Sequence, residues 1–158
     1  MMIDNNFFLK THNYLKKIAT EIIIPNIGKL SENEVSTKED NSKVTSYDII
    51  VENKLIEYFK NIGFSNIISE EGNSELIKKN EYMTVDPIDG TRSYVVGNPS
   101  WSNLISLNYN GEPILGLANF PKMRKYYLNV NKNSAFVFEK NKKRKLKINS
   151  KLNFKNAK

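Results

Sequence analysis

The chain has 158 residues, of which 39% are hydrophobic and 11% aromatic, enough for one domain with an apolar core. It contains no cysteine, which excludes a disulfide framework, a thiolate metal site and a cysteine nucleophile. The net charge of +7 is concentrated near the C-terminus, where residues 139–158 hold nine Lys or Arg and one acidic residue. The composition therefore indicates a small globular protein with a basic end.

The sequence shows no membrane-spanning segment. Apolar runs such as Ile22–Ile24, which precedes Pro25, are far shorter than the roughly 20 residues that a membrane-spanning helix needs. The N-terminus has Asp4 early and no basic stretch leading into an apolar one, which argues against a secretory signal. We therefore expect a soluble, cytoplasmic protein that does not bind a membrane.

Two helices are expected in the first third of the chain. Apolar residues recur at three- and four-residue steps through residues 5–24, and Pro25 closes that segment. Residues 28–44 are polar and are expected to form a loop. A second helix is expected over residues 46–62, because Thr45 and Asp48 have the spacing of a capping box.

The pattern after residue 63 is that of β-strands. Asn110-Gly111 lies between two apolar stretches and predicts a hairpin, and Phe136–Phe138 and Leu146–Ile148 are expected to form another around the basic run. Two helices followed by strands predict an α+β fold, with the helices packed on a mostly antiparallel sheet. Strands are expected at 66–69, 81–86, 103–109, 112–119, 125–130, 135–139 and 144–148.

The basic run Lys140–Lys145 has two interpretations. It could form a surface that binds nucleic acid. It could also be a solvated hairpin turn followed by a loose terminus. No aromatic residue interleaves with the run, so the sequence favours the second interpretation and argues against nucleic-acid binding.

Two acidic clusters, Ser69-Glu70-Glu71-Gly72 and Asp86-Pro87-Ile88-Asp89-Gly90-Thr91, carry the most informative chemistry. Pro87 biases Asp86 towards an extended conformation, and a bend here could point Asp86 and Asp89 at one hard cation such as Mg²⁺. If Thr91 opens a helical turn, its free N–H groups would face a phosphate. The same residues are also typical of a plain β-turn, and these residues alone leave both interpretations open.

The second cluster favours a shared site. Glu70 follows the apolar Ile67 and Ile68, as Asp86 follows Met83 and Val85. Two strands would then each end in a carboxylate, and we expect the two carboxylates to lie close together.

Three segments, in order, resemble the Mg²⁺-dependent phosphatases of the inositol monophosphatase superfamily. Lys38–Asp48 looks like the family's loop leading to a Thr-x-x-Asp helix start, and Ser69–Gly72 is similar to its Gly-Glu-Glu segment with Ser69 in place of Gly. Asp86–Thr91 matches its signature, which residues 92–99 continue. Residues 99–107 look most like the histidinol-phosphate phosphatase branch, and the resemblance runs from about residue 8 to residue 150.

The resemblance implies a role for each matching residue. Mg²⁺ would be bound by Glu70, Asp86, the carbonyl of Ile88 and Asp89. Asp48, Thr91 and Glu70 would be catalytic, with Asp48 and Thr91 orienting the attacking water, and Lys38 would lie on a loop near the metals. The substrate phosphate would be bound at Ile88, Asp89, Gly90 and Thr91. The substrate would be a small phosphorylated metabolite, histidinol phosphate or inositol phosphate, and the protein a homo-oligomer.

The chain also departs from the family pattern. Family members continue into a second domain with a Trp-Asp-x-Ala-Ala-Gly-like segment, whose Asp completes the second metal site. We expect residues 1–150 to correspond to the N-terminal domain, residues 151–158 to form a polar, basic tail, and the family's C-terminal domain to be absent. We therefore expect a truncated, weakly active phosphate monoester hydrolase. The alternative is a non-catalytic remnant or interaction module that binds Mg²⁺ and phosphate weakly.

Overall fold

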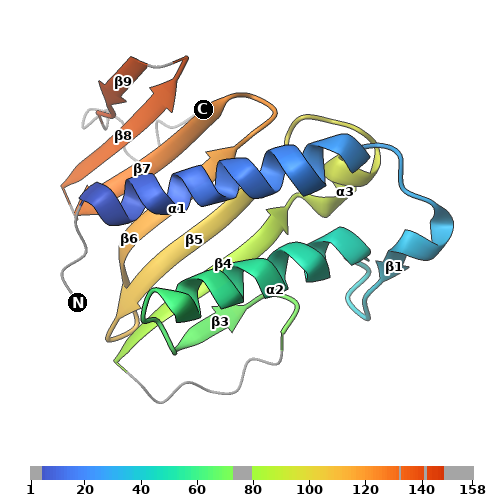
Figure 1. The fold of residues 1–158 in the computed structure, drawn as a ribbon, viewed down its shortest axis with the longest axis horizontal. Helices are drawn as coiled ribbons and strands as arrows, with labels where there is room; N and C mark the ends of the chain where they lie inside the picture. The colour runs from blue at the N-terminus through green and yellow to red at the C-terminus, as the bar shows by residue number, and fades with distance from the viewer. Residues whose placement is uncertain (1–4, 73–79, 132, 141, 148–158) are drawn as a thin grey trace, which may run out of the picture.

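The computed structural model describes residues 5–72, 80–131, 133–140 and 142–147. Two long helices, α1 (Asn5–Ile18) and α2 (Ser46–Asn61), lie across one face of a seven-stranded sheet (Figure 1). This arrangement confirms the predicted α+β class. The sheet strands are β3 (Ile67–Ser69), β4 (Glu81–Asp89), β5 (Ser102–Tyr109), β6 (Glu112–Phe120), β7 (Lys125–Asn131), β8 (Ser134–Glu139) and β9 (Lys142–Lys145).

The sheet follows chain order from β3 to β9. Among the described strands of this sheet, only β3 and β4 pair in parallel, and each later pair is antiparallel, as the hairpin pattern predicts. At the turn between β5 and β6, Asn110 and Gly111 both have positive φ values, 51° and 80°. This is the conformation in which Asn-Gly is favoured in tight hairpins.

The predicted helix over residues 5–24 changes its winding before it ends. The regular helix α1 stops at Ile18, a π-helical turn follows at Ala19–Ile23, and a 3₁₀ turn follows at Ile24–Asn26. Pro25 lies in that last turn, and the Asn26 side chain donates a hydrogen bond to the Ile22 carbonyl at 2.7 Å. The N-terminal helical segment therefore ends where the proline predicts.

The core lies between the helices and the sheet. Helix α2 buries Val51, Leu55 and Phe59, one turn apart, against the β4 side, where Met83 and Val85 are buried. Helix α1 reaches the far strands through stacked rings. The His12 ring lies 3.7 Å from that of Tyr126 on β7, which lies 4.4 Å from that of Phe138 on β8.

The structure corrects two predictions, one for the polar stretch 28–44 and one for the hairpin around the basic run. The polar stretch 28–44 contains a small hairpin, β1 (Val35–Thr37) paired with β2 (Lys43–Thr45). The second predicted hairpin has its partners shifted, because the basic run itself forms β9 and pairs Lys143 with Phe138 and Lys145 with Phe136. Ile148 and the predicted tail 151–158 lie outside the described residues.

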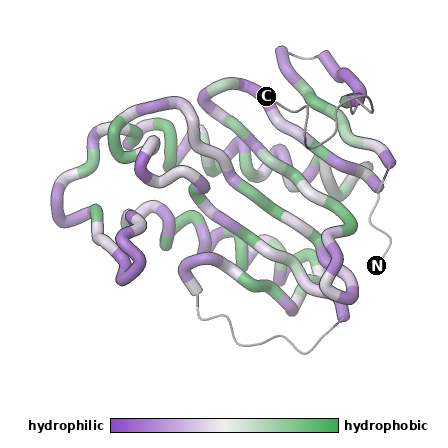
Figure 2. Tube along the Cα trace, turned by 180° about the vertical axis from the view of Figure 1, so that it is seen from behind, coloured by the Kyte–Doolittle hydropathy of each residue, from purple (hydrophilic) through white to green (hydrophobic). Residues whose placement is uncertain are grey.

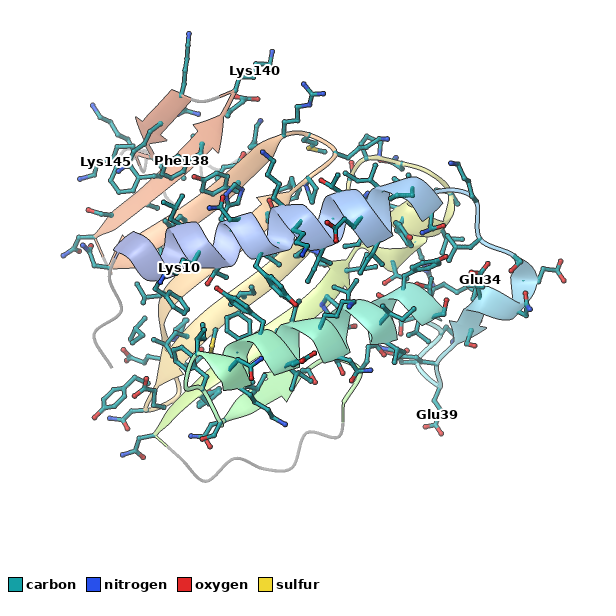
Figure 3. The ribbon with its side chains drawn as sticks, viewed as in Figure 1. Lys10, Glu34, Glu39, Phe138, Lys140 and Lys145 are labelled. Atoms are coloured by element: carbon teal, nitrogen blue, oxygen red, sulfur yellow. The ribbon has the colours of Figure 1, made fainter. Side chains whose placement is uncertain are left out.

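Aromatic side chains explain why a lysine-rich run forms a strand. The Lys143 ammonium lies 4.2 Å from the centre of the Phe136 ring and 5.6 Å from that of Phe138. Figure 3 shows Phe138 and Lys145 on these neighbouring strands, with Lys140 at the loop between them. Lysine stems can cover aromatic rings while their charges stay in water. An exposed, charged strand is also a common end to a sheet.

The other face of the sheet carries no helix among the described residues (Figure 2). It forms an open hollow of about 730 Å³, and the residues that line it include the small Thr84, Ser106, Gly116 and Ala118. Glu70 and Asp86 lie at its border. The hollow thus meets the two acidic clusters that the sequence singles out.

Removing the Phe59 ring should destabilise the protein strongly. Phe59 is fully buried, so Phe59→Ala should lower the free energy of unfolding by about 3–5 kcal/mol. Ile50→Ala, on the same helix but 41% exposed, should change it by less than about 0.5 kcal/mol. Urea unfolding followed by circular dichroism measures both values. Equal losses in the two variants would contradict the packing described above.

Candidate functional site

The end of β4 is bent by a β-bulge. Asp86 pairs with Leu104 and Asp89 pairs with Ser102, so Pro87 and Ile88 together face a single residue of β5. The plain β-turn interpretation is therefore wrong, because Asp86–Asp89 remains part of a strand. Because the bulge changes the direction of the strand, it places two carboxylates and the intervening backbone at one corner of the sheet.

Buried amides hold this bulge in place. The fully buried Asn103 donates from its side-chain amide to the Pro87 carbonyl at 2.6 Å, and Asn119 donates to Asn103 Oδ1 at 2.9 Å. The Ser102 hydroxyl donates to Asp89 Oδ2 at 3.0 Å. Buried polar groups of this kind fix a backbone when every one has a partner.

A short helix follows the bulge. Gly90 has φ +85° and precedes α3 (Thr91–Val95), and a Cβ at Gly90 would lie 2.9 Å from the Ser100 carbonyl oxygen. Only glycine combines this φ with so close an approach. The buried Tyr94 ring contacts Trp101 edge-on at 5.8 Å and anchors the helix. Thr91 therefore opens a helical turn, as the sequence suggested.

Thr91 connects the bulge with α2. Its hydroxyl lies 3.0 Å from the Ile88 carbonyl oxygen and 3.3 Å from Asp48 Oδ1. The other oxygen of Asp48 accepts hydrogen bonds from the Thr45 N–H at 2.8 Å and the Thr45 hydroxyl at 2.6 Å, which completes the predicted capping box. Burial raises the pKa of Asp48, against the opposing effect of the Thr45 hydrogen bonds. Asp48 is thus held with one oxygen directed at Thr91.

The two acidic clusters meet, as expected from the strand ends. Ser69 pairs with Val85 in the parallel β3–β4 ladder, and the Glu70 N–H donates to the Val85 carbonyl at 3.2 Å. Glu70 therefore follows its strand directly beside Asp86. The next residue, Glu71, donates its N–H to Glu52 Oε2 on α2 at 2.8 Å.

Lys38 reaches the same cluster from the β1–β2 hairpin. Its ammonium lies 2.7 Å from Glu71 Oε1 and 3.4 Å from Glu70 Oε1. Burial alone would lower the pKa of Lys38, but the hydrogen bonds and charges of Glu71 and Glu70 outweigh it and raise that pKa. The hairpin is also held by Arg92, which donates to the Asn41 carbonyl at 2.8 Å. Figure 3 shows Glu39 near the hairpin tip, pointing away from the rest of the fold.

The carboxylate of Asp86 lies in surroundings that disfavour its negative charge. One of its carboxylate oxygens, Oδ1, is buried and has no hydrogen-bond partner. Burial raises the pKa of Asp86 to about 8, together with the charge of Glu70, a hydrogen bond with Glu70, and the charges of Asp89 and Asp48. A carboxylate in such surroundings is stabilised by a cation.

The donor atoms fit a hard divalent cation. Carboxylates of Glu70, Asp86 and Asp89, with the Ile88 carbonyl, are the oxygen ligands that Mg²⁺ prefers. Glu70 is turned towards Lys38, and among the described residues no three Asp, Glu or His side chains already form a metal-binding group. The fit therefore rests on donor chemistry and on the buried oxygen of Asp86 rather than on a finished coordination shell.

Sequence reasoning missed the residues that support the site from behind. Glu52, Ser102, Asn103 and Asn119 are all buried and hydrogen-bonded to the acidic clusters, to the bulge or to one another. Asn103 and Asn119 break the apolar pattern of their strands, and Glu52 lies at the helical spacing of the apolar Leu55 and Phe59. These three could have been found by that signal, whereas Ser102 has none.

Comparison with known proteins identifies the family. The profile of the inositol monophosphatase family matches residues 4–157, nearly the whole chain. The chain belongs to the inositol monophosphatase family, as its signature segments indicate.

Two curated relatives are similar to this chain over part of their length. The chain is 35% identical over 101 residues to a chloroplastic bifunctional phosphatase of Arabidopsis thaliana, a match that covers 62% of this chain and 29% of the relative. It is 29% identical over 104 residues to the histidinol-phosphatase of Mycobacterium tuberculosis, with 65% and 40% covered. The matched region is thus less than half of each relative's length.

Solved structures share the fold. The IMPase of Thermotoga maritima superposes with a TM-score of 0.74 at 24% identity, covering 84% of this chain and 51% of the other. An IMPase/NADP phosphatase solved with Mg²⁺ and phosphate gives a TM-score of 0.69 at 18% identity, covering 84% and 49%. These similarities confirm the α+β fold for the part of the chain that superposes.

Neutralising Asp86 should stabilise the metal-free protein at high pH. The folded carboxyl keeps its proton up to about pH 8, whereas its ordinary pKa is 3.8. Between these values the folded state binds more protons, so the free energy of unfolding falls as pH rises. Asp86→Asn removes this titration, and its advantage over wild type should grow to the order of 1 kcal/mol at pH 8, given partial solvent screening.

Thermal unfolding in chelator between pH 4 and pH 8 measures this difference. Asp40→Asn is the control, because hydrogen bonds from Ser42 lower the pKa of the exposed Asp40 and no gain at pH 8 is expected there. Parallel pH profiles for wild type and Asp86→Asn would contradict the prediction.

The buried amide pair should matter more than a neighbouring amide on the same strand. Asn103→Leu leaves the Pro87 carbonyl and the Asn119 amide without their partner, and should lower the free energy of unfolding by about 1–3 kcal/mol. Asn108→Leu on β5 removes only contacts of 3.4–3.5 Å and should cost clearly less. Urea unfolding of both variants tests this order, and a reversed order would contradict it.

Proposed function

We propose that this chain is a Mg²⁺-dependent phosphate monoester hydrolase, most like the histidinol-phosphate phosphatases, with weak activity on its own. The observation that carries the proposal is the buried, unpartnered oxygen of Asp86, placed beside Glu70 and Asp89. The short helix that opens at Thr91 lies next to it. Cation-binding and phosphate-binding groups thus converge at one corner of the sheet.

Each residue has a role in this proposal. Glu70, Asp86, Asp89 and the Ile88 carbonyl hold Mg²⁺, which when bound neutralises phosphate charge and lowers the pKa of water. The backbone N–H groups at Gly90 and Thr91 bind phosphate oxygens, because the first N–H groups of a helix lack partners within it.

Asp48 and Thr91 orient the attacking water. Thr45 fixes one oxygen of Asp48, and the other lies 3.3 Å from the Thr91 hydroxyl. When Thr91 donates its proton to Asp48, the lone pairs of its oxygen can accept a hydrogen bond from water. Asp48 thereby sets the direction of that hydroxyl.

The choice of substrate rests on the relatives. The Mycobacterium tuberculosis relative is named a histidinol-phosphatase, and the superposed IMPase/NADP phosphatase was solved with Mg²⁺ and phosphate. We therefore place histidinol phosphate first and inositol phosphate next.

A cytoplasmic homo-oligomer is part of the same proposal. Within the described residues, no helix is long and apolar enough to cross a bilayer.

The second candidate is a binding module without turnover. The open hollow on the sheet favours it, because the described residues leave that face free beside the acidic corner. Such a module would hold Mg²⁺ and phosphate weakly and contact another polypeptide through this face.

Phosphate release distinguishes the two candidates. With Mg²⁺, the wild-type chain should release inorganic phosphate from histidinol phosphate, and both chelator and Asp86→Asn should reduce the rate at least about 100-fold. Glu39→Gln, a neutralised acid at the hairpin tip, is the matched control and should keep the wild-type rate.

Turnover that survives chelation or Asp86→Asn would refute the hydrolase proposal. A folded chain that binds Mg²⁺ by calorimetry without turnover of histidinol phosphate or inositol phosphate would establish the binding module instead. A folded chain that does neither would refute both.

A further inference from the structure

A buried carboxylate on α2 lies behind the proposed metal site. Glu52 is 5% exposed and follows Asp48 by four residues, so the two lie on the same side of the helix. A carboxylate is seldom buried unless it has hydrogen-bond partners or a counter-charge. The partners of Glu52 therefore indicate what it does.

Glu52 is bonded to the turn that follows β3. Its Oε2 accepts the Glu71 N–H at 2.8 Å. Its Oε1 would lie 3.2 Å from a Cβ placed on Gly72, and the Ser69 hydroxyl would lie closer still, at 2.5 Å. A side chain at Gly72 would crowd the Ser69 hydroxyl and the Glu52 carboxylate, so the turn packs closely against α2.

Successive N–H groups of this turn are held from opposite sides. The Glu70 N–H donates to the Val85 carbonyl on β4, and the Glu71 N–H donates to Glu52 on α2. These two hydrogen bonds fix the orientation of the Glu70–Glu71 peptide. That orientation sets the direction in which the Glu70 side chain leaves the backbone. The Glu71 side chain, 6% exposed, in turn receives Lys38 at 2.7 Å.

We propose that Glu52 is a positioning residue that fixes the Glu70–Glu71 peptide and so directs Glu70 to the metal site beside Asp86. The inference rests on the proposed function, in which Glu70 is a metal ligand. Glu52 itself does not touch metal or substrate. What it supplies is an acceptor oxygen for the part-buried N–H of Glu71.

This role depends on the acceptor and not on the negative charge. The negative charges of Glu70 and Glu71 face the Glu52 carboxylate, and Lys38 is the cation that the structure places on them. An amide oxygen can accept the same N–H without adding repulsion. Glutamine should therefore replace Glu52, and an apolar residue of similar length should not.

Mg²⁺ affinity measured by calorimetry tests the inference. Glu52→Met should weaken binding about 10–100-fold, the usual effect of losing a group that orients a metal ligand. Glu52→Gln should stay within about threefold of wild type. Phe59→Leu, a core change on the same helix, controls for lost stability and should leave Mg²⁺ affinity unchanged.

The Glu71 amide gives a second readout that needs no metal. Hydrogen exchange followed by NMR in chelator should show protection of this amide in wild type and Glu52→Gln, and its loss in Glu52→Met. Wild-type Mg²⁺ affinity in Glu52→Met, or equally weak binding in both Glu52 variants, would overturn the inference. If the wild type binds no Mg²⁺, the proposed function fails, and the amide exchange still tests the inference. Equal protection of the Glu71 amide in all variants would overturn the inference.

Discussion

The pairing of two strand ends, β3 beside β4, is the constraint on which the site depends. A parallel pair brings the residues that follow both strands to one edge, so Glu70 comes to lie next to Asp86 although 16 positions separate them in the sequence. The bulge in β4 then turns the backbone towards α3, and Thr91 ties it to α2 through Asp48. A shift in the register of the β3–β4 pair would separate the acidic groups even if every residue were unchanged.

The acidic corner of the protein brings together like charges that repel one another. Acidic side chains from β4, the turn after β3 and α2 lie near one another, and burial raises the pKa of Asp48, Glu52 and Asp86. Lys38 pairs with Glu71 and Glu70, and the other supporting groups named above are neutral amides, hydroxyls and backbone N–H groups. Concentrating acidic groups in this way lowers folding stability, and under the proposed function a bound cation offsets that loss.

Local chemistry allowed much of this to be predicted. Thr45 with Asp48 and Asn110-Gly111 each have a conformation that short-range sterics and hydrogen bonds determine, and the structure has them as a helix cap and a hairpin turn. For Asp86–Thr91 the sequence left a plain turn and a turn opening a helix both possible, and the structure has the helical turn at Thr91. The β1–β2 hairpin was missed, and the last strand was predicted two residues too late, at 144–148 in place of Lys142–Lys145, because these residues are polar. Their stability comes from partners distant in sequence, such as Glu71 for Lys38, or across a strand pair, such as Phe136 for Lys143. The bulge and the role of Glu52 depend on tertiary contacts that no local pattern records.

The two edges of the described sheet have a consequence for assembly. The β3 edge is only three residues long, and the β9 edge consists of four exposed Lys and Arg residues. Both are poor templates for adding a strand from another molecule, the first because it is short and the second because like charges would face each other. Addition of a strand at either edge of the described sheet is therefore disfavoured. Another layer of structure would pack more readily on its open face.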